Sequence, residues 1–139
     1  MALPNVKISL ANGALGRVDE TGDGIAGLVI SASAAPTGLA LATPKVIYNL
    51  QAAVALGITE AALPKVYRQI KEFYDGYNYA TGSENAELHI LLVAETMTLT
   101  QMADTTVSNS AKSLIDAAQG RIKLLGLSRN PASGYTPTV

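Results

Sequence analysis

The spacing of apolar residues predicts several short strands in the first third of the chain. Residues 6–10 alternate apolar and polar side chains, which is the period of a half-buried β-strand. Residues 13–24 are polar and glycine-rich, which is typical of an exposed loop, and residues 24–34 hold a compact apolar run that predicts a buried strand. Residues 39–43 follow a turn at residues 36–38 and are predicted to return as the second strand of a hairpin.

The clearest helix in the pattern lies between Pro64 and Gly82. Pro64 suits the first turn, where its missing amide is not needed, and Gly82 lies beyond the end of the apolar stripe. A shorter helix is predicted to begin after Asn49, a good capping residue, and to stop at Gly57. The stripe of the longer helix recurs at steps of three and four residues and consists of Leu63, Val66, Tyr67, Ile70, Phe73, Tyr74 and Tyr77.

Strands and helices alternate in the second half of the chain. Residues 45–48 are predicted to be extended, and residues 87–94 are almost continuously apolar, which predicts a central strand. A helix is then predicted, with Ser108 near its start and Gly120 after its end, before a further strand at residues 121–127. The apolar face of that helix consists of Val107, Ala111, Leu114, Ile115 and Ala118.

This order predicts an α/β fold. We expect a mixed sheet of about four to six strands flanked by helices, because strands that alternate with helices have parallel neighbours. The chain divides into an N-terminal strand or arm at residues 1–12, an α/β domain at residues 13–129 and a linker-like tail at residues 130–139.

Composition favours a protein that works inside an assembly. Charged residues make up 15% of the chain and the net charge is −1, so a free monomer would repel its copies only weakly. Binding to nucleic acid needs an excess of Lys and Arg, and the chain has 10 basic against 11 acidic residues. No run approaches the ~20 apolar residues of a membrane span, and the first residues lack the pattern of a signal peptide. We therefore expect a soluble intracellular protein that binds neither nucleic acid nor a membrane.

Two glycine-rich motifs resemble known binding sites but lack features that those sites require. Residues 22–27 spell GxGxxG, but the residues before them are polar and those after them favour a strand, whereas a dinucleotide site needs a strand before and a helix after. The acidic residues from Asp19 onward resemble a calcium loop, but the twelfth residue is Ile30 instead of the required Glu. The chain has no Cys, which excludes thiolate metal sites and Cys nucleophiles. We expect no cofactor and no metal.

Catalytic chemistry is not expected either. His89 is the single histidine and lies within an apolar strand, where a core or interface histidine is the ordinary interpretation. Glu87 and Glu95 flank that strand, which is a weak arrangement for acid–base catalysis. The tyrosines at positions 67, 74, 77 and 79 could stack on bases, but nucleic-acid binding would also need a basic surface around them, which the sequence does not predict. We therefore interpret these tyrosines as a core edge or a subunit interface.

The order of these pieces resembles the N-terminal part of a phage contractile tail sheath protein. More specifically, it is similar to a sheath-like prophage family whose function was long unassigned. Sheath proteins have a glycine-bearing strand near the start, a Leu-Gly or Phe-Gly element, a helix ending in two aromatic residues and then a strongly apolar strand. The matching segments here are residues 3–8, 24–30, 56–58, 70–74, 87–93 and 121–126.

The resemblance implies a structural subunit without catalytic residues. Such proteins form stacked hexameric rings around a tail tube and contract to drive the tube through a cell envelope, so the implied partners are further copies and the tail tube protein. The implied location is the host cytoplasm during assembly and then the virion tail or an injection apparatus. Terminal arms of sheath subunits add strands to neighbouring copies. The candidate assembly contacts are Val6, Ile8 and Leu10 in the arm, and Tyr67, Tyr74 and Tyr77 in the long helix.

Two other functions remain open from the sequence. Sheath proteins are usually much longer, with further domain material and a C-terminal arm, so the chain corresponds to a portion of one. A small α/β enzyme or ligand-binding domain would instead use the crevice at the carboxyl ends of its strands, with polar residues after positions 94 and 127. A tail-completion or baseplate adaptor would form one ring but no tube.

Overall fold

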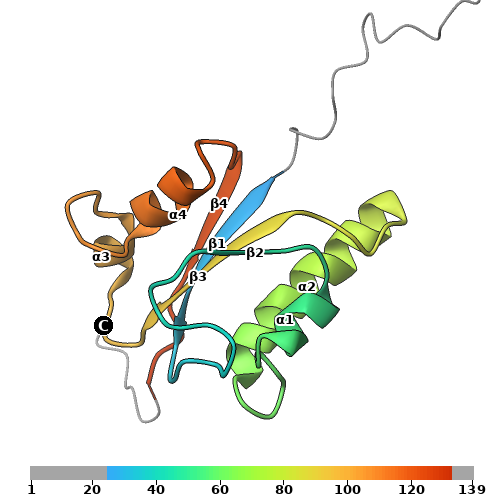
Figure 1. The fold of residues 1–139 in the computed structure, drawn as a ribbon, viewed down its shortest axis with the longest axis horizontal. Helices are drawn as coiled ribbons and strands as arrows, with labels where there is room; N and C mark the ends of the chain where they lie inside the picture. The colour runs from blue at the N-terminus through green and yellow to red at the C-terminus, as the bar shows by residue number, and fades with distance from the viewer. Residues whose placement is uncertain (1–24, 133–139) are drawn as a thin grey trace, which may run out of the picture.

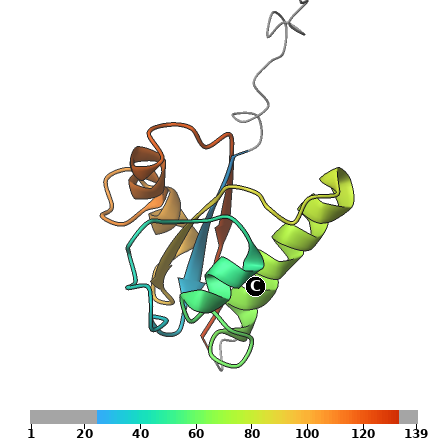
Figure 2. The same cartoon turned by 45° about the vertical axis from the view of Figure 1, so that its right-hand side comes forward.

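A four-stranded sheet lies between two pairs of helices, so the domain has three layers (Figure 1). The computed structural model describes residues 25–132. The strands are β1 (Ala26–Ala32), β2 (Lys45–Ile47), β3 (Leu88–Ala94) and β4 (Leu124–Ser128). The helices are α1 (Leu50–Ala55), α2 (Pro64–Thr81), α3 (Leu99–Ala103) and α4 (Ala111–Ala117). Helices α1 and α2 cover one face of the sheet, and α3 and α4 cover the other (Figure 2).

The sheet has the strand order β2-β3-β1-β4 and is mixed. Strand β1 pairs in parallel with β3 on one side and with β4 on the other, whereas β2 runs antiparallel to β3. The α/β fold predicted from the alternation of elements is therefore confirmed. Strand β3 is central, as its apolar run predicted, and the first six of its seven residues are buried. Buried side chains alternate between the two faces, because successive residues of a strand point to opposite sides of the sheet.

The predicted hairpin between residues 24–34 and 39–43 is wrong. Both edges of β1 are occupied by parallel strands, and its seven residues are all in register with β3. Residues 39–43 instead form turns, in which Leu39 is buried and Ala42 has a φ of 63°, which no extended strand allows. A single backbone hydrogen bond, from Ala42 N to Leu92 O at 2.6 Å, ties this loop to the sheet.

Local signals place the helix ends correctly on the first face. The side chain of Asn49 accepts a hydrogen bond from Ala52 N at 2.9 Å and caps α1, and Gly57 follows with a φ of 87°. Pro64 begins α2, and Gly82 ends it in the left-handed conformation that favours glycine. These four positions confirm the predicted limits of both helices.

The second face holds a helix that the sequence pattern did not predict. Helix α3 is five residues long and is fixed by a capping box between Thr98 and Gln101. Only Met102 within it is buried, so it leaves no periodic stripe to recognise. Helix α4 begins at Ala111, three residues later than the start predicted near Ser108.

Candidate assembly edge of the sheet

The two edges of the sheet differ in how they are protected. Strand β2 is short, follows Pro44 and carries the exposed Lys45, and these features discourage pairing with another strand. Strand β4 has five residues, Leu-Leu-Gly-Leu-Ser, and none of them is charged. Within residues 25–132, no strand pairs with the outer side of β4. Among the described residues, the β4 edge therefore lacks the protective features that β2 has.

Apolar side chains accompany this open edge on both faces. Leu125 and Leu127 are half-buried against the core beneath α3 and α4. On the opposite face Leu124 is 69% exposed, although it is the first residue of a sheet strand. Leu28 of β1 lies over Gly126, because a Cβ atom at Gly126 would stand 2.7 Å from Leu28 Cδ2. An added strand would cover apolar surface as well as complete hydrogen bonds.

The N-terminal part of the chain enters the sheet beside β4. Lys123 N donates to Ile25 O at 2.9 Å, immediately before β1 and β4 begin to pair. The candidate contacts Val6, Ile8 and Leu10 lie outside the described residues. Residues 11–24 connect them to β1 and, fully extended, span at most about 46–50 Å.

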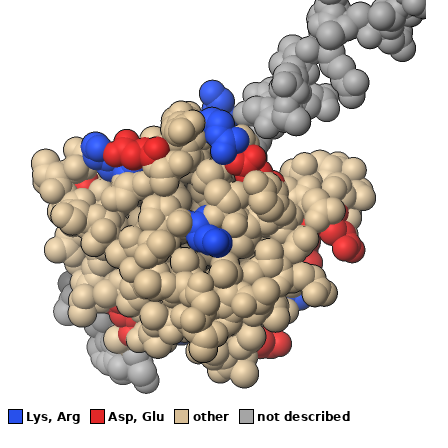
Figure 3. Space-filling view, in the orientation of Figure 1, with Lys and Arg blue, Asp and Glu red and all other residues tan. Residues whose placement is uncertain are grey.

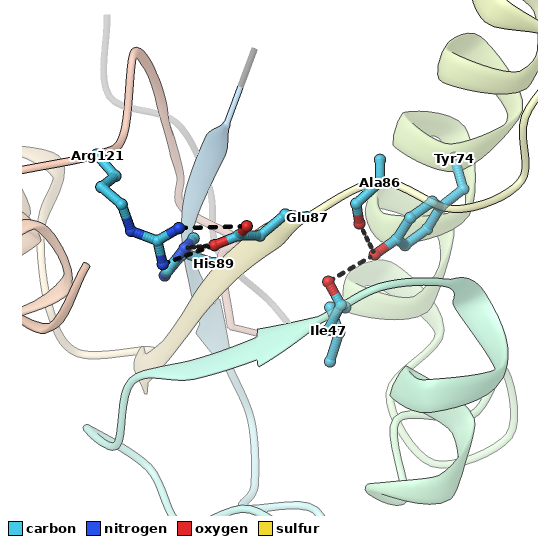
Figure 4. Close-up of polar contacts among 6 residues, drawn as sticks. All are labelled: Ile47, Tyr74, Ala86, Glu87, His89 and Arg121. Carbon is cyan, nitrogen blue, oxygen red and sulfur yellow. Dashed lines mark hydrogen bonds and ion pairs between the residues drawn. The ribbon is translucent and has the colours of Figure 1, made fainter. Parts of the chain in front are cut away.

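The tyrosines of α2 separate into core and surface residues. Tyr74 is buried, and its hydroxyl is shared between the carbonyls of Ile47 at 3.1 Å and Ala86 at 3.3 Å (Figure 4). Burial raises the pKa of Tyr74 well above its ordinary value. Tyr74 is thus a core residue with 4% of its surface exposed, which leaves little of it for the predicted contact with another subunit. Tyr67 and Tyr77 are partly buried against the same core.

A polar cluster joins β3 to the segment before β4. Glu87 Oε1 lies 2.8 Å from Nε2 of His89, and Arg121 donates to both carboxylate oxygens, with one N–O distance of 2.8 Å (Figure 4). His89 is 2% exposed, so the interpretation as a core histidine is confirmed. Partial burial disfavours the charged form of Glu87, but the hydrogen bonds from His89 and Arg121 outweigh this and hold its pKa below the ordinary value.

This cluster predicts a loss of stability in acid. Because the folded-state pKa of Glu87 lies below the unfolded value, the cluster stabilises the fold above the ordinary glutamate pKa of 4.5. The stabilisation is lost as the pH falls through the lowered folded pKa. Urea unfolding of the wild type and Glu87→Gln at a series of pH values should show a difference at pH 7 that shrinks below about pH 4.5. Glu95→Gln, at the other end of β3, is the control and should track the wild type; an equal difference at every pH would contradict the prediction.

A pocket lies at the carboxyl ends of β1 and β3. It has a volume of about 380 Å³ and is lined by Ser33, Lys65, Glu95 and neighbouring residues. The chains leaving β1 and β3 pass to opposite faces of the sheet, so this is the position at which open α/β sheets bind ligands. Asn130 closes one side of the pocket.

Asn130 is anchored, although it is the first residue of the predicted linker-like tail. Its Nδ2 donates to Ser31 O at 3.0 Å, its backbone N donates to Ser31 Oγ at 2.6 Å, and Gln69 Nε2 donates to its Oδ1 at 3.1 Å. The ordered domain therefore continues past position 129, while residues 133–139 lie outside the described part of the chain. No sequence signal identified Asn130, because its partners are about a hundred and about sixty positions away.

The remaining sequence motifs add no site. Gly27, the last residue of the GxGxxG pattern, lies inside β1, so a strand follows the pattern as predicted. Among residues 25–132 no three His, Cys, Asp or Glu side chains gather as metal ligands. In the same part of the chain no helix has both the length and the apolar character needed to cross a membrane. The face in Figure 3 is mostly uncharged, with a few basic and acidic groups scattered over it.

Comparison with known proteins identifies a family. No curated protein and no solved structure matches the chain. Residues 3–126 match the family described as DUF2586, N-terminal domain. This match includes the arm candidates at residues 6–10 and every strand of the sheet, apart from the last two residues of β4. The chain therefore belongs to the DUF2586 family and carries its N-terminal domain.

Proposed function

We propose that this chain is a structural subunit of a phage-type contractile tail sheath, which assembles into rings or tubes around a tail tube. The observation that carries the proposal is the uncharged edge of β4, with which no further strand pairs within residues 25–132, and the exposed Leu124 beside it. Natural proteins usually protect such an edge with charge, proline or a covering segment, since it otherwise pairs with other chains. The ordered resemblance to sheath proteins and the low charge of the chain support the same function.

Strand addition is the proposed mode of assembly. Residues 6–10 match β4 in length, and their alternation gives one apolar face, formed by Val6, Ile8 and Leu10. Docked beside β4 of a neighbouring copy, that face lies on the same side of the sheet as the exposed Leu124, while the backbone completes the ladder. The added strand supplies affinity through main-chain hydrogen bonds and specificity through its alternate side chains.

The subunit acts by packing and performs no catalysis. Its partners are further copies of the chain and a tail tube protein, and it moves from the host cytoplasm to the virion tail or an injection apparatus. Contraction changes the register between rigid subunits, because packed domains of this kind rotate against each other more readily than they deform. The three-layer core, closed on both faces of the sheet, suits such a rigid unit.

Ile8→Asp tests this function, with Ser9→Asp as the matched control. We expect the wild type to form rings or tubes in negative-stain electron microscopy, with a light-scattering mass that rises with concentration. Ile8→Asp places a charge on the apolar face of the arm and should lower the assembly affinity at least ~100-fold, whereas Ser9→Asp places the same charge on the polar face and should change it little. A wild type that stays monomeric, or equal effects of the two variants, would contradict the proposal. A single ring without a tube would favour a baseplate adaptor.

A ligand-binding domain is the second candidate, and the pocket at the carboxyl ends of β1 and β3 favours it. Lys65 and Glu95 give that pocket groups of both signs. Thermal unfolding of the wild type with inorganic phosphate or a mononucleotide distinguishes the candidates. A concentration-dependent rise in Tm that Lys65→Ala removes would support ligand binding. No rise with either probe would count against it.

A further inference from the structure

The end of α2 stands clear of the domain (Figures 1 and 2). Beyond Tyr77 all five residues at positions 78–82 are exposed, and the chain is buried again only at Ala86. Tyr79 is 95% exposed, the highest exposure of the large apolar side chains described. We call residues 78–85 the spur. With this exposure, the Tyr79 side chain makes almost no packing contact with the described part of the domain. Packing within the domain therefore does not explain an aromatic residue at this position.

The spur carries negative charge only. Glu84 is the single charged residue between positions 76 and 86, and it forms no ion pair within the described residues. The unpaired carbonyl groups at the end of an α-helix add a partial negative charge. Asp75 lies one helical turn before Tyr79 and forms an ion pair with Lys71 of the same helix, so it adds no unpaired negative charge to the spur.

A basic groove lies at the opposite end of the same helix. It has a volume of about 630 Å³ and is formed by the amino-terminal half of α2 and the segment at Asn130 and Pro131. Its basic side chains are Lys65, Arg68 and Lys71, of which Arg68 is paired with Glu72 and Lys71 with Asp75 in the same helix, and its lining carboxylate is Glu60. Lys65 Nζ donates to Pro131 O at 3.0 Å, a neutral acceptor, and has no carboxylate partner among residues 25–132. Tyr67 supplies an aromatic wall.

The geometry points to a head-to-tail contact in which the spur of one copy occupies the basic groove of the next. Tyr79 enters the groove beside Tyr67, and Glu84 meets Lys65. A second copy of the chain is the fitting occupant because Glu84 of the spur and Lys65 of the groove each lack an ion-pair partner among residues 25–132, whereas two spurs would bring like charges together. Tyrosine is among the residues that contribute most to interfaces when buried in a pocket.

This contact joins different surfaces of the two copies, so repeating it builds a ring or an open helix. It rests on the proposed self-assembly of the chain and names a second interface for it. Strand addition to β4 and the spur contact use separate parts of the domain. Each can therefore fail without the other.

Cysteine cross-linking tests the contact, because the chain has no cysteine of its own. Glu60→Cys marks the groove and keeps its three cations, and Ala80→Cys marks the spur and keeps Tyr79. Fifteen residues of helix separate Pro64 from Tyr79, about 22 Å, so these two cysteines cannot pair within one chain. Mixing the two single-cysteine proteins under mild oxidation should give mainly the mixed dimer, and the double variant should give a ladder of larger species.

The anchor residue is tested in the same assay. Adding Tyr79→Ser to the spur variant should lower the yield of mixed dimer at least ~10-fold, whereas Tyr48→Ser, which removes another exposed tyrosine, should leave it unchanged. Absence of the mixed dimer, or a dominant link between two Ala80→Cys chains, overturns the contact. If the mixed dimer is absent but wild-type chains still form rings that depend on Ile8, the proposed function survives. If wild-type chains form no assembly at all, the spur contact and the proposed function both fail.

Discussion

Leu124→Lys is expected to dissociate the assembly while leaving the domain folded. Leu124 is 69% exposed, so a lysine there keeps its charge in water in the monomer and changes stability little. In the assembly the same charge lies against the apolar side chains of the strand added to β4. Removing a charge from water without a partner costs several kcal/mol, and each 1.4 kcal/mol is tenfold in affinity. We expect the assembly affinity to fall about 100-fold or more.

Sedimentation velocity over a concentration series measures this effect, with urea unfolding beside it. Val54→Lys is the matched control, because Val54 is also exposed, at 42%, but belongs to α1, which packs against α2 and against β2 at the opposite edge of the sheet. The control should assemble as the wild type does. Equal assembly by both variants would mean that the β4 edge takes no part in the contact.

Asn130→Ala should give the largest loss of stability among substitutions of polar residues. The change removes the hydrogen bond to Ser31 O at 3.0 Å, in a buried position, and that from Gln69 Nε2 at 3.1 Å, in a partly buried one. A buried polar group left unpaired costs about 1–3 kcal/mol, so we expect the free energy of unfolding to fall by about 2–4 kcal/mol. Ser31 itself is fully buried when Asn130 is in place.

Urea unfolding followed by circular dichroism checks this value, and Asn78→Ala provides the comparison. Asn78 is exposed in α2, so its replacement should change stability by less than about 0.5 kcal/mol. If Asn130→Ala were as stable as the wild type, the segment after β4 would be a linker that contributes nothing to the domain, as the sequence pattern alone predicts.

The elements that the sequence predicted well are those specified by residues near each other in the chain. Pro64 and Gly82 mark both ends of α2, and Asn49 marks the start of α1, because caps and breakers act within one helical turn. The hairpin failed because strand pairing is not local. Nothing in residues 39–43 shows that the edge of β1 is already taken by β4, nearly a hundred residues further along the chain.

The candidate site was only partly predictable for the same reason. The helical spacing of Tyr67, Tyr74 and Tyr77 places all three on one face, but it cannot distinguish a core position from an interface position. The structure assigns Tyr74 to the core through two carbonyl groups from other elements. Likewise, the strand at β4 was predicted, but its position at an edge depends on the order of the whole sheet.

Cryo-electron microscopy of the wild-type assembly tests the central claim most directly. The account predicts that residues 6–10 form a fifth strand beside β4 of a neighbouring copy, with Val6, Ile8 and Leu10 on the same face of the sheet as Leu124. An assembly in which the outer side of β4 faces solvent, or is covered by the N-terminal residues of its own chain, would contradict it.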